Sequence, residues 1–118
     1  MPRYADGFVI TVPKRKLDAY RRISQKAGRV WKQYGAIEYI ECVGDDLKIP
    51  MGLPFPRLTK AKPGEAVVFS WILYKSRRDR DRANRKVMAD PRIKMDVKSM
   101  PFDMKRMAYG GFRVLVDM

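Results

Sequence analysis

The chain of 118 residues contains no histidine and a single cysteine, Cys42. Without histidine it lacks the commonest general base and the usual zinc ligand, so Ser-His and Cys-His catalytic arrangements and ordinary zinc sites are excluded. One cysteine cannot form an internal disulfide, which is typical of proteins from reducing compartments. We interpret Cys42 as a small buried apolar side chain rather than as a nucleophile.

Long apolar runs and glycine-rich phosphate loops are missing as well. The longest apolar stretch covers residues 66–74 and is interrupted by Ser70, which is far short of the roughly 20 residues that a membrane-spanning helix needs. The chain enters a strand-like run without an apolar signal segment before it. We therefore expect a cytoplasmic protein without membrane contact. Because no Walker-type or dinucleotide-binding pattern occurs, we expect no cofactor.

Acidic residues are few, and they offer one candidate cation site. Asp45 and Asp46 follow a strand-like segment that also carries Glu41, and oxygen ligands of this kind suit hard cations. An adjacent acidic pair after a strand is more often part of a turn, so we expect no metal site.

Basic residues number 26 against 13 acidic ones, and the net charge is +13. The excess is spread over both halves of the chain and can serve simply as a solubilising surface. It also permits association with nucleic acid or another polyanion. The candidates for that contact lie together in one predicted helix: Arg77, Arg78, Arg80, Arg82, Arg85 and Lys86.

The first 43 residues show a strand, a helix and a second strand. Side chains alternate from Tyr4 to Val12, which predicts a strand that ends at Pro13. Apolar residues then recur every three or four positions over 17–34, which predicts an amphipathic helix ending at Gly35. Gly28 inside this helix indicates close packing of the backbone. Residues 36–43 alternate again and predict the second strand, with Glu38 and Glu41 on opposite faces.

The second half begins with a long loop, Gly44 to Gly64, of the kind that often forms lids or binding loops, with a short strand within 58–60. Residues 65–75 predict the strongest strand, apolar on both faces. Ser76 and Asp79 suggest a capped helix that runs to Ala89, with an apolar stripe of Ala83, Val87 and Met88. Residues 95–103 read as irregular, and a last strand over 105–116 carries a bulge or bend at Gly110-Gly111.

The resulting order, β-α-β-β-α-β, predicts one α+β domain over residues 1–118, a ferredoxin-like plait with a four-stranded antiparallel sheet and both helices on one face. The other face is bare. Strands that are apolar on both faces would leave too large an exposed patch there, so we expect a homodimer in which two sheets stack as a dimeric α/β barrel. Either Phe69 or Val68 belongs to that interface, because the pattern does not decide which face meets the helices. An RNA-recognition module has the same order, but its characteristic Lys/Arg-Gly-Phe signature is absent from 66–75.

Aromatic side chains suggest a pocket between the sheet and the helices, where tyrosine hydroxyls and indole N–H groups can orient a planar ligand. Glu38 or Glu41 is a candidate buried carboxylate that could act as a base there, although a salt bridge is the plainer interpretation. Asn84 is expected to point inward beside Arg80 and to find a hydrogen-bond partner. The candidate ligand-binding residues are Trp31, Tyr34, Glu38, Tyr39, Trp71, Tyr74 and Tyr109.

Several stretches resemble the YbaA-like bacterial family catalogued as domain of unknown function 1428. They are Asp6-Gly7-Phe8-Val9, Lys26-Ala27-Gly28-Arg29-Val30-Trp31, residues 35–42, Phe69-Ser70-Trp71-Ile72, Tyr74-Lys75-Ser76-Arg77, residues 86–92 and residues 106–112. The resemblance covers nearly the whole chain. It implies the dimeric α/β-barrel superfamily, whose members include cofactor-independent oxygenases, isomerase-like enzymes and stress-induced proteins. It brings no established reaction, and fold does not imply function.

These observations favour a homodimer whose cavity binds an apolar or aromatic small molecule, with cofactor-independent chemistry left open. A basic protein that binds nucleic acid or another polyanion is the alternative from a different class. A structural interaction module without a cavity or an enzymatic activity is the third.

Overall fold

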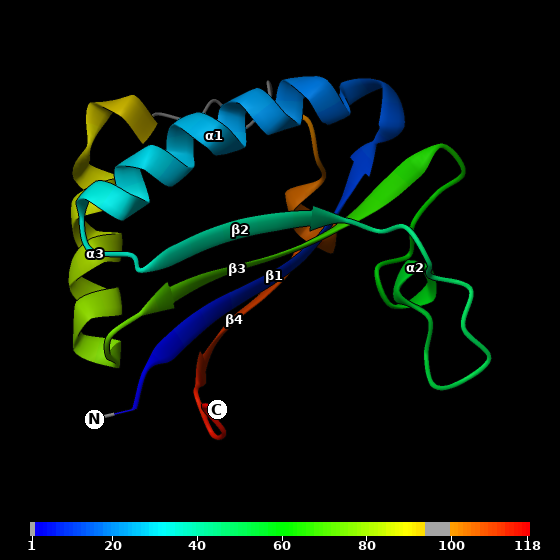
Figure 1. Ribbon diagram of the computed structural model, residues 1–118. Helices are drawn as coiled ribbons and strands as arrows, with labels where there is room; N and C mark the ends of the chain where they lie inside the picture. Colours follow the sequence, from blue (N-terminus) through cyan, green and yellow to red (C-terminus); the bar gives the residue numbers. More distant parts are fainter. Residues whose placement is uncertain (1, 94–99) are drawn as a thin grey trace.

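The computed structural model describes residues 2–93 and 100–118 (Figure 1). Its strands are β1 (Tyr4–Pro13), β2 (Glu38–Val43), β3 (Glu65–Tyr74) and β4 (Ala108–Arg113), and its helices are α1 (Leu17–Gln33), α2 (Phe55–Leu58) and α3 (Arg77–Ala89). The strands form one antiparallel sheet in the order β2-β3-β1-β4. The predicted β-α-β-β-α-β order is confirmed, with the single-turn helix α2 added inside the long loop.

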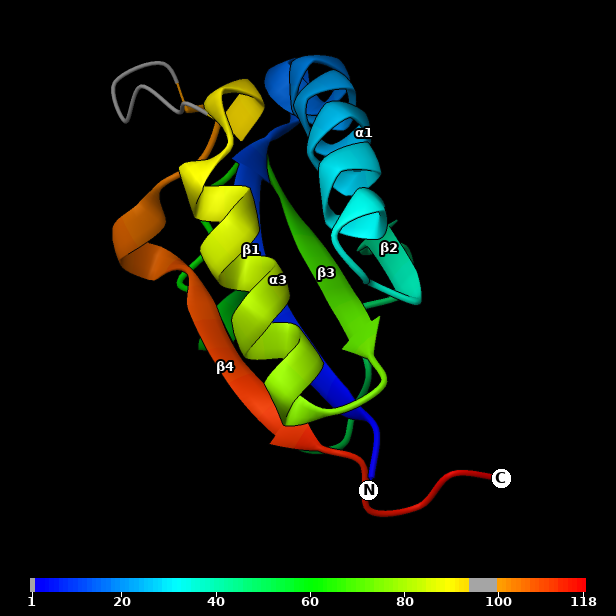
Figure 2. The same ribbon diagram turned by 90° about the vertical axis from the view of Figure 1, so that its left-hand side faces the viewer.

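Both long helices cover the same face of the sheet, with α1 and α3 in front of the strands in Figure 2. Alternation along the strands sends Ile10 and Val12 of β1 and Val68 and Ile72 of β3 into the layer under these helices. Phe69 faces the other way and is 44% exposed. The structure thus decides which face of β3 meets the helices: Val68 is in the core, and Phe69 lies on the face that the helices leave open.

Three local features inferred from the sequence recur in the structure. Gly35 has φ +121°, the left-handed conformation expected after a helix end. A Cβ at Gly28 would lie 2.7 Å from the ring of Tyr39, so the helix approaches β2 closely there. Ser76 caps α3, because its hydroxyl accepts a hydrogen bond from the backbone N–H of Asp79 at 3.2 Å.

The long loop differs from the sequence-based expectation. No strand forms within 58–60; the chain instead makes the helical turn α2, and Lys60 takes a positive φ of 55° just after it. Phe55 of α2 packs edge-on against Phe69, with ring centroids 6.3 Å apart, so the loop reaches the open face of the sheet. The loop therefore meets the sheet through the ring of Phe55 rather than by strand pairing, while Met51, Leu53 and Leu58 remain exposed.

The last strand is also shorter than expected and contains no bulge. β4 covers Ala108–Arg113, and its register with β1 runs without interruption through Gly110 and Gly111. A Cβ at Gly111 would lie 2.1 Å from Nη2 of Arg80, so this glycine makes room for a side chain from α3. Met88, expected in the apolar stripe of α3, is 67% exposed, whereas Ala83 and Val87 are buried. The irregular segment expected over 95–103 lies partly outside the described residues.

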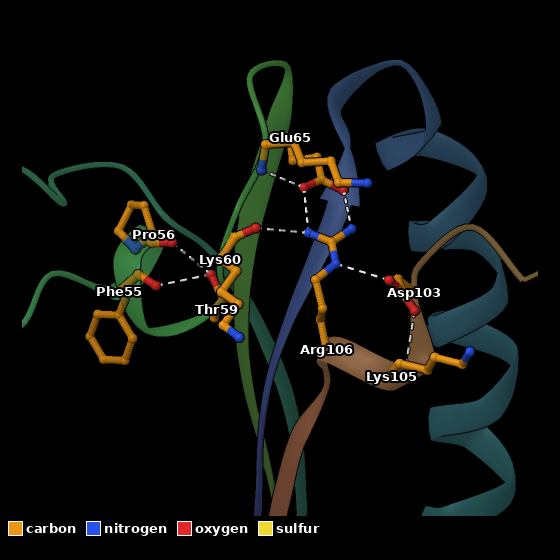
Figure 3. Close-up of polar contacts among 9 residues, drawn as sticks. Phe55, Pro56, Thr59, Lys60, Glu65, Asp103, Lys105 and Arg106 are labelled. Carbon is orange, nitrogen blue, oxygen red and sulfur yellow. Dashed lines mark hydrogen bonds and ion pairs between the residues drawn. The ribbon is translucent and has the colours of Figure 1, made fainter.

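Arg106 ties the chain before β4 to the start of β3 (Figure 3). Its two terminal nitrogens each donate to one carboxylate oxygen of Glu65 at 2.7 Å, and its Nε donates to Asp103 at 2.9 Å. A further bond reaches the carbonyl oxygen of Lys60 at 3.1 Å. Hydrogen bonds from Arg106 lower the pKa of Glu65 to about 2. We refer to these contacts of Arg106 with Glu65, Asp103 and Lys60 as the Arg106 clamp. The clamp fixes the 3₁₀ turn Met104–Arg106, and Met104 of this turn lines a cavity under the helices.

Candidate ligand-binding cavity

A cavity of about 430 Å³ lies between the sheet and the two long helices. β1 contributes Phe8 and Ile10 to its floor, and α1 contributes Ala27 and Trp31 to its roof. Its lining is predominantly apolar and aromatic. A volume of this size, with few polar groups among apolar walls, is typical of small-molecule sites.

Four methionines form much of the remaining roof. They come from α3 and from the segment between residues 100 and 107: Met88, Met100, Met104 and Met107. Met88 and Met104 are also exposed to solvent, so they stand at the rim rather than deep inside. Because methionine side chains are unbranched and polarizable, such a rim can adapt to ligands of different shape.

Asp6 brings a buried carboxyl group to the cavity. Its side chain is almost completely buried, and its Oδ1 accepts a hydrogen bond from Nε of Arg80 at 3.0 Å. The same guanidinium group lies over the ring of Tyr4, 4.9 Å from the centroid. Burial raises the pKa of Asp6, and the positive charge of Arg80 opposes that rise. Asp6 is therefore a carboxyl group held in an apolar cavity by one cation.

Asn84 completes this polar end. Its Oδ1 accepts hydrogen bonds from Nε1 of Trp31 at 3.2 Å and from the hydroxyl of Tyr74 at 3.3 Å. An amide oxygen with two donors fixes the orientation of the side chain, and the amide NH₂ is then the group with which Asn84 can donate. Beside it, the ring of Tyr109 stacks on Phe8 with centroids 4.7 Å apart. Burial raises the pKa of Tyr109, so its hydroxyl stays protonated.

A second polar cluster lies on the β2 side of the cavity. The hydroxyls of Tyr20 and Tyr39 donate to the two carboxylate oxygens of Glu41, the bond from Tyr39 measuring 3.0 Å. Burial raises the pKa of both tyrosines, and the charge of Glu41 raises it further. Both hydroxyls therefore remain donors at physiological pH. Glu41 faces the helices and Glu38 the open face, as the strand alternation predicts.

The structure separates the ligand-binding candidates proposed from the sequence. Trp31, Tyr39 and Tyr109 line the cavity, and Tyr74 reaches its polar end through Asn84. Trp71 borders the cavity as a residue of β3, but its ring contacts Phe69 and its Nε1 donates to Glu38 at 3.1 Å on the open face. The hydroxyl of Tyr34 donates to Asp90 at 2.7 Å, beyond the end of α1. Glu38, Trp71 and Tyr34 thus point away from the cavity, contrary to the expectation.

Sequence reasoning missed Asp6, Tyr20 and the methionines as site residues. The signal for Asp6 was present, because it shares a strand face with Phe8, Ile10 and Val12, and a charged residue in an apolar stripe demands a partner. Met100, Met104 and Met107 gave no such signal, since they come from a segment without regular periodicity, whereas Met88 was predicted only as part of the apolar stripe of α3.

The polyanion candidates do not form one free patch. Arg80 points inward to Asp6 and is wrong as a surface contact. Arg82 pairs with Asp79 at 2.7 Å. The interpretation of Cys42 as buried is also wrong, because it lies exposed on the open face of β2.

Across residues 2–93 and 100–118, no group of three or more acidic, cysteine or histidine side chains is placed to hold a metal ion. In the same part of the chain, every helix is too short or too polar to cross a membrane.

Comparison with known proteins gives a family and a fold. The family model described as "Protein of unknown function (DUF1428)" matches residues 3–104. The uncharacterized protein YbaA of Escherichia coli K12 is 48% identical over 115 residues and covers 98% of each chain, and YbaA of Shigella flexneri matches equally. The crystal structure of a dimeric ferredoxin-like protein from an uncultured marine organism has a TM-score of 0.61 at 15% identity and covers 100% of this chain and 98% of the other. At this low identity the likeness shows the fold alone.

Proposed function

Because the chain belongs to the DUF1428 family, which is described as of unknown function, we propose a function from its own residues: it binds an apolar or aromatic small molecule between sheet and helices. The observation that carries the proposal is the cavity of about 430 Å³, apolar over most of its wall and supplied with a few fixed polar groups. This combination is the usual basis of small-molecule recognition, in which apolar walls give affinity and polar groups give orientation.

The polar end suggests how such a ligand is oriented. Asp6 offers a carboxylate acceptor held by Arg80, and Asn84 offers its amide NH₂ because its oxygen already has two donors. A ligand that carries one hydrogen-bonding group on an apolar body satisfies these groups, and its flat part packs against Trp31 and Tyr109. The proposal is a binding function and needs no cofactor.

The test uses N-phenyl-1-naphthylamine, a neutral aromatic probe whose fluorescence rises in apolar surroundings. We expect saturable binding at one probe per chain, and at least a tenfold loss of affinity in Ala27→Phe, which places a ring in the cavity. Met104→Trp, at a half-exposed rim position, narrows the entrance and provides a second variant if Ala27→Phe does not fold. The matched control, Phe69→Ala, removes an exposed aromatic ring from the opposite face and should leave binding unchanged. A probe affinity that falls in Phe69→Ala but is unchanged in both Ala27→Phe and Met104→Trp would refute the proposal.

We also propose that two copies pair through the open face of the sheet. Ile40, Phe69 and Phe112 lie on this face and are exposed, although their side chains are large and apolar. The structural neighbour is described as dimeric, which supports self-association, and the choice of the open face rests on these exposed apolar side chains. Phe69→Asp introduces a charge into this surface, so light scattering at micromolar concentration should show a dimer for the native chain and a monomer for the variant. A monomeric native chain would exclude the pairing.

A further inference from the structure

A second hollow, of about 920 Å³, runs along the outer side of α1 beside the edge strand β2. Leu17, Val43 and Val68 give it an apolar floor, and basic residues of α1 form its wall. It differs from the inner cavity because charged side chains stand along its length. We refer to it as the outer groove.

The outer groove and the inner cavity are neighbours with a thin common wall. Four residues line both hollows: Tyr20, Ser24, Tyr39 and Glu41. The wall is therefore the cluster in which both tyrosine hydroxyls donate to Glu41. Neither tyrosine is fully buried, and a ligand that occupies both hollows has to displace at least one of the two hydroxyls from Glu41.

Charge differs between the two halves of the groove. Near the start of α1, Arg21 is neutralised by Asp18 at 2.7 Å. Further along, Arg29 and Lys32 line the groove one helical turn apart and therefore share a helix face. Lys32 donates to the carbonyl oxygen of Ile37 at 2.6 Å, which leaves two of its three ammonium protons for other acceptors. This half of the groove is suited to an anionic group.

The carboxylates fix the direction in which a charged ligand would lie. Asp6 on β1 and Glu41 on β2 are separated by β3 and offset by two residues along it, which places them about 12 Å apart at ordinary strand spacing. Glu41 has both oxygens occupied by tyrosine hydroxyls, whereas Asp6 stands at the inner end of the cavity. At the inner end the cation, Arg80, is already paired with Asp6, so an anionic end of a ligand finds its cations at Arg29 and Lys32 outside the wall.

We propose that the ligand of this protein is an amphipathic carboxylic acid, its apolar body in the inner cavity and its carboxylate at Arg29 and Lys32 in the outer groove. The inference rests on the proposed function, since it needs an apolar body in the cavity, and it adds the chemical class of the ligand. A two-cation site in partial contact with solvent favours the acid over the neutral alcohol of equal length by about tenfold in affinity.

The experiment displaces N-phenyl-1-naphthylamine with a matched pair, decanoic acid and 1-decanol, at pH 7.5. The native chain should bind the acid about tenfold more tightly than the alcohol. The double variant Arg29→Gln with Lys32→Gln should lose that preference and keep its affinity for the alcohol. The matched control, Arg57→Gln with Lys75→Gln, also removes one arginine and one lysine charge, but at exposed positions outside the groove. It should keep the preference for the acid over the alcohol.

The outcomes separate the two proposals. Equal binding of acid and alcohol by the native chain overturns the inference and leaves the proposed function standing. A preference for the acid that survives in the Arg29 and Lys32 variant overturns it as well, because the charge must then be recognised elsewhere. Failure of the probe and of both displacing molecules to bind rejects the cavity itself, and the inference with it.

Discussion

The ion pair between Glu65 and Arg106 makes a quantitative prediction about stability and pH. The pKa of Glu65 falls from an ordinary value of 4.5 to about 2 in the folded chain. A shift of that size corresponds to at most about 3 kcal/mol of folding free energy. The Arg106 and Glu65 side chains are 16% and 11% exposed, and solvent screening reduces the expected contribution to roughly 1–2 kcal/mol.

The sign follows from proton binding. Because the folded state holds the proton of Glu65 less tightly than the unfolded state, the stabilisation is complete above about pH 4.5 and is lost as the pH falls toward 2. Glu65→Gln should therefore lower the free energy of unfolding by roughly 1–2 kcal/mol at pH 7 and by almost nothing near pH 2.

Urea unfolding followed by circular dichroism, at pH 7 and at intervals down to pH 2.5, measures this difference. Glu38→Gln is the matched control, since Glu38 is exposed and bonds to an indole rather than to an arginine. A double-mutant cycle with Arg106→Met should return a coupling of the same size. Equal stability of the native chain and Glu65→Gln at pH 7, or a difference that persists unchanged at pH 2.5, would refute the reasoning.

Three substitutions give further predictions, each checked by urea unfolding at pH 7. Replacing glycine by alanine inside a helix normally stabilises it by about 1 kcal/mol, but the methyl group of Gly28→Ala meets the ring of Tyr39. We therefore expect Gly28→Ala to lower the free energy of unfolding of the native chain by about 1 kcal/mol. The same substitution should raise the free energy of unfolding of a Tyr39→Ala variant. Gly111→Ala displaces the guanidinium of Arg80 and should cost about 1–2 kcal/mol; an unchanged stability would contradict the packing there. Ser76→Ala removes the N-cap of α3 and should cost about 1 kcal/mol, while Ser76→Gly costs only a few tenths, and equal losses for the two would argue against a capping role.

Much of the fold could be predicted because it depends on local periodicity. The change from alternation to a spacing of three and four marks the step from β1 to α1, and Ser76 marks the start of α3. The long loop could not be predicted in the same way. Pro54 and Pro56 restrict their own φ angles but do not specify where the segment packs, and that place is set by the contact of Phe55 with Phe69.

The site was only partly predictable, because it depends on which face of each strand meets the helices. Val68 and Phe69 are both apolar, so their types do not reveal that parity, and Trp71 was consequently assigned to the cavity although its ring faces away. Trp31 was identified because the helix pattern places it on the apolar face of α1 independently of this choice. Tyr39 was named together with Glu38 from the opposite face of β2, so the strand pattern did not choose between them. The methionines of the cavity roof depend on how the clamp around Arg106 folds the chain, which is a long-range contact.

The two tryptophans allow the most direct test of the central claim, that the cavity under the helices is the ligand site. The indole N–H of Trp31 bonds to Asn84 in the cavity, and that of Trp71 bonds to Glu38 on the open face. A ¹H–¹⁵N correlation spectrum resolves these two signals, and N-phenyl-1-naphthylamine can be titrated at a fixed protein concentration. The account predicts that the Trp31 signal shifts and saturates while the Trp71 signal stays in place. A shift confined to Trp71 would place the ligand on the open face and contradict the account.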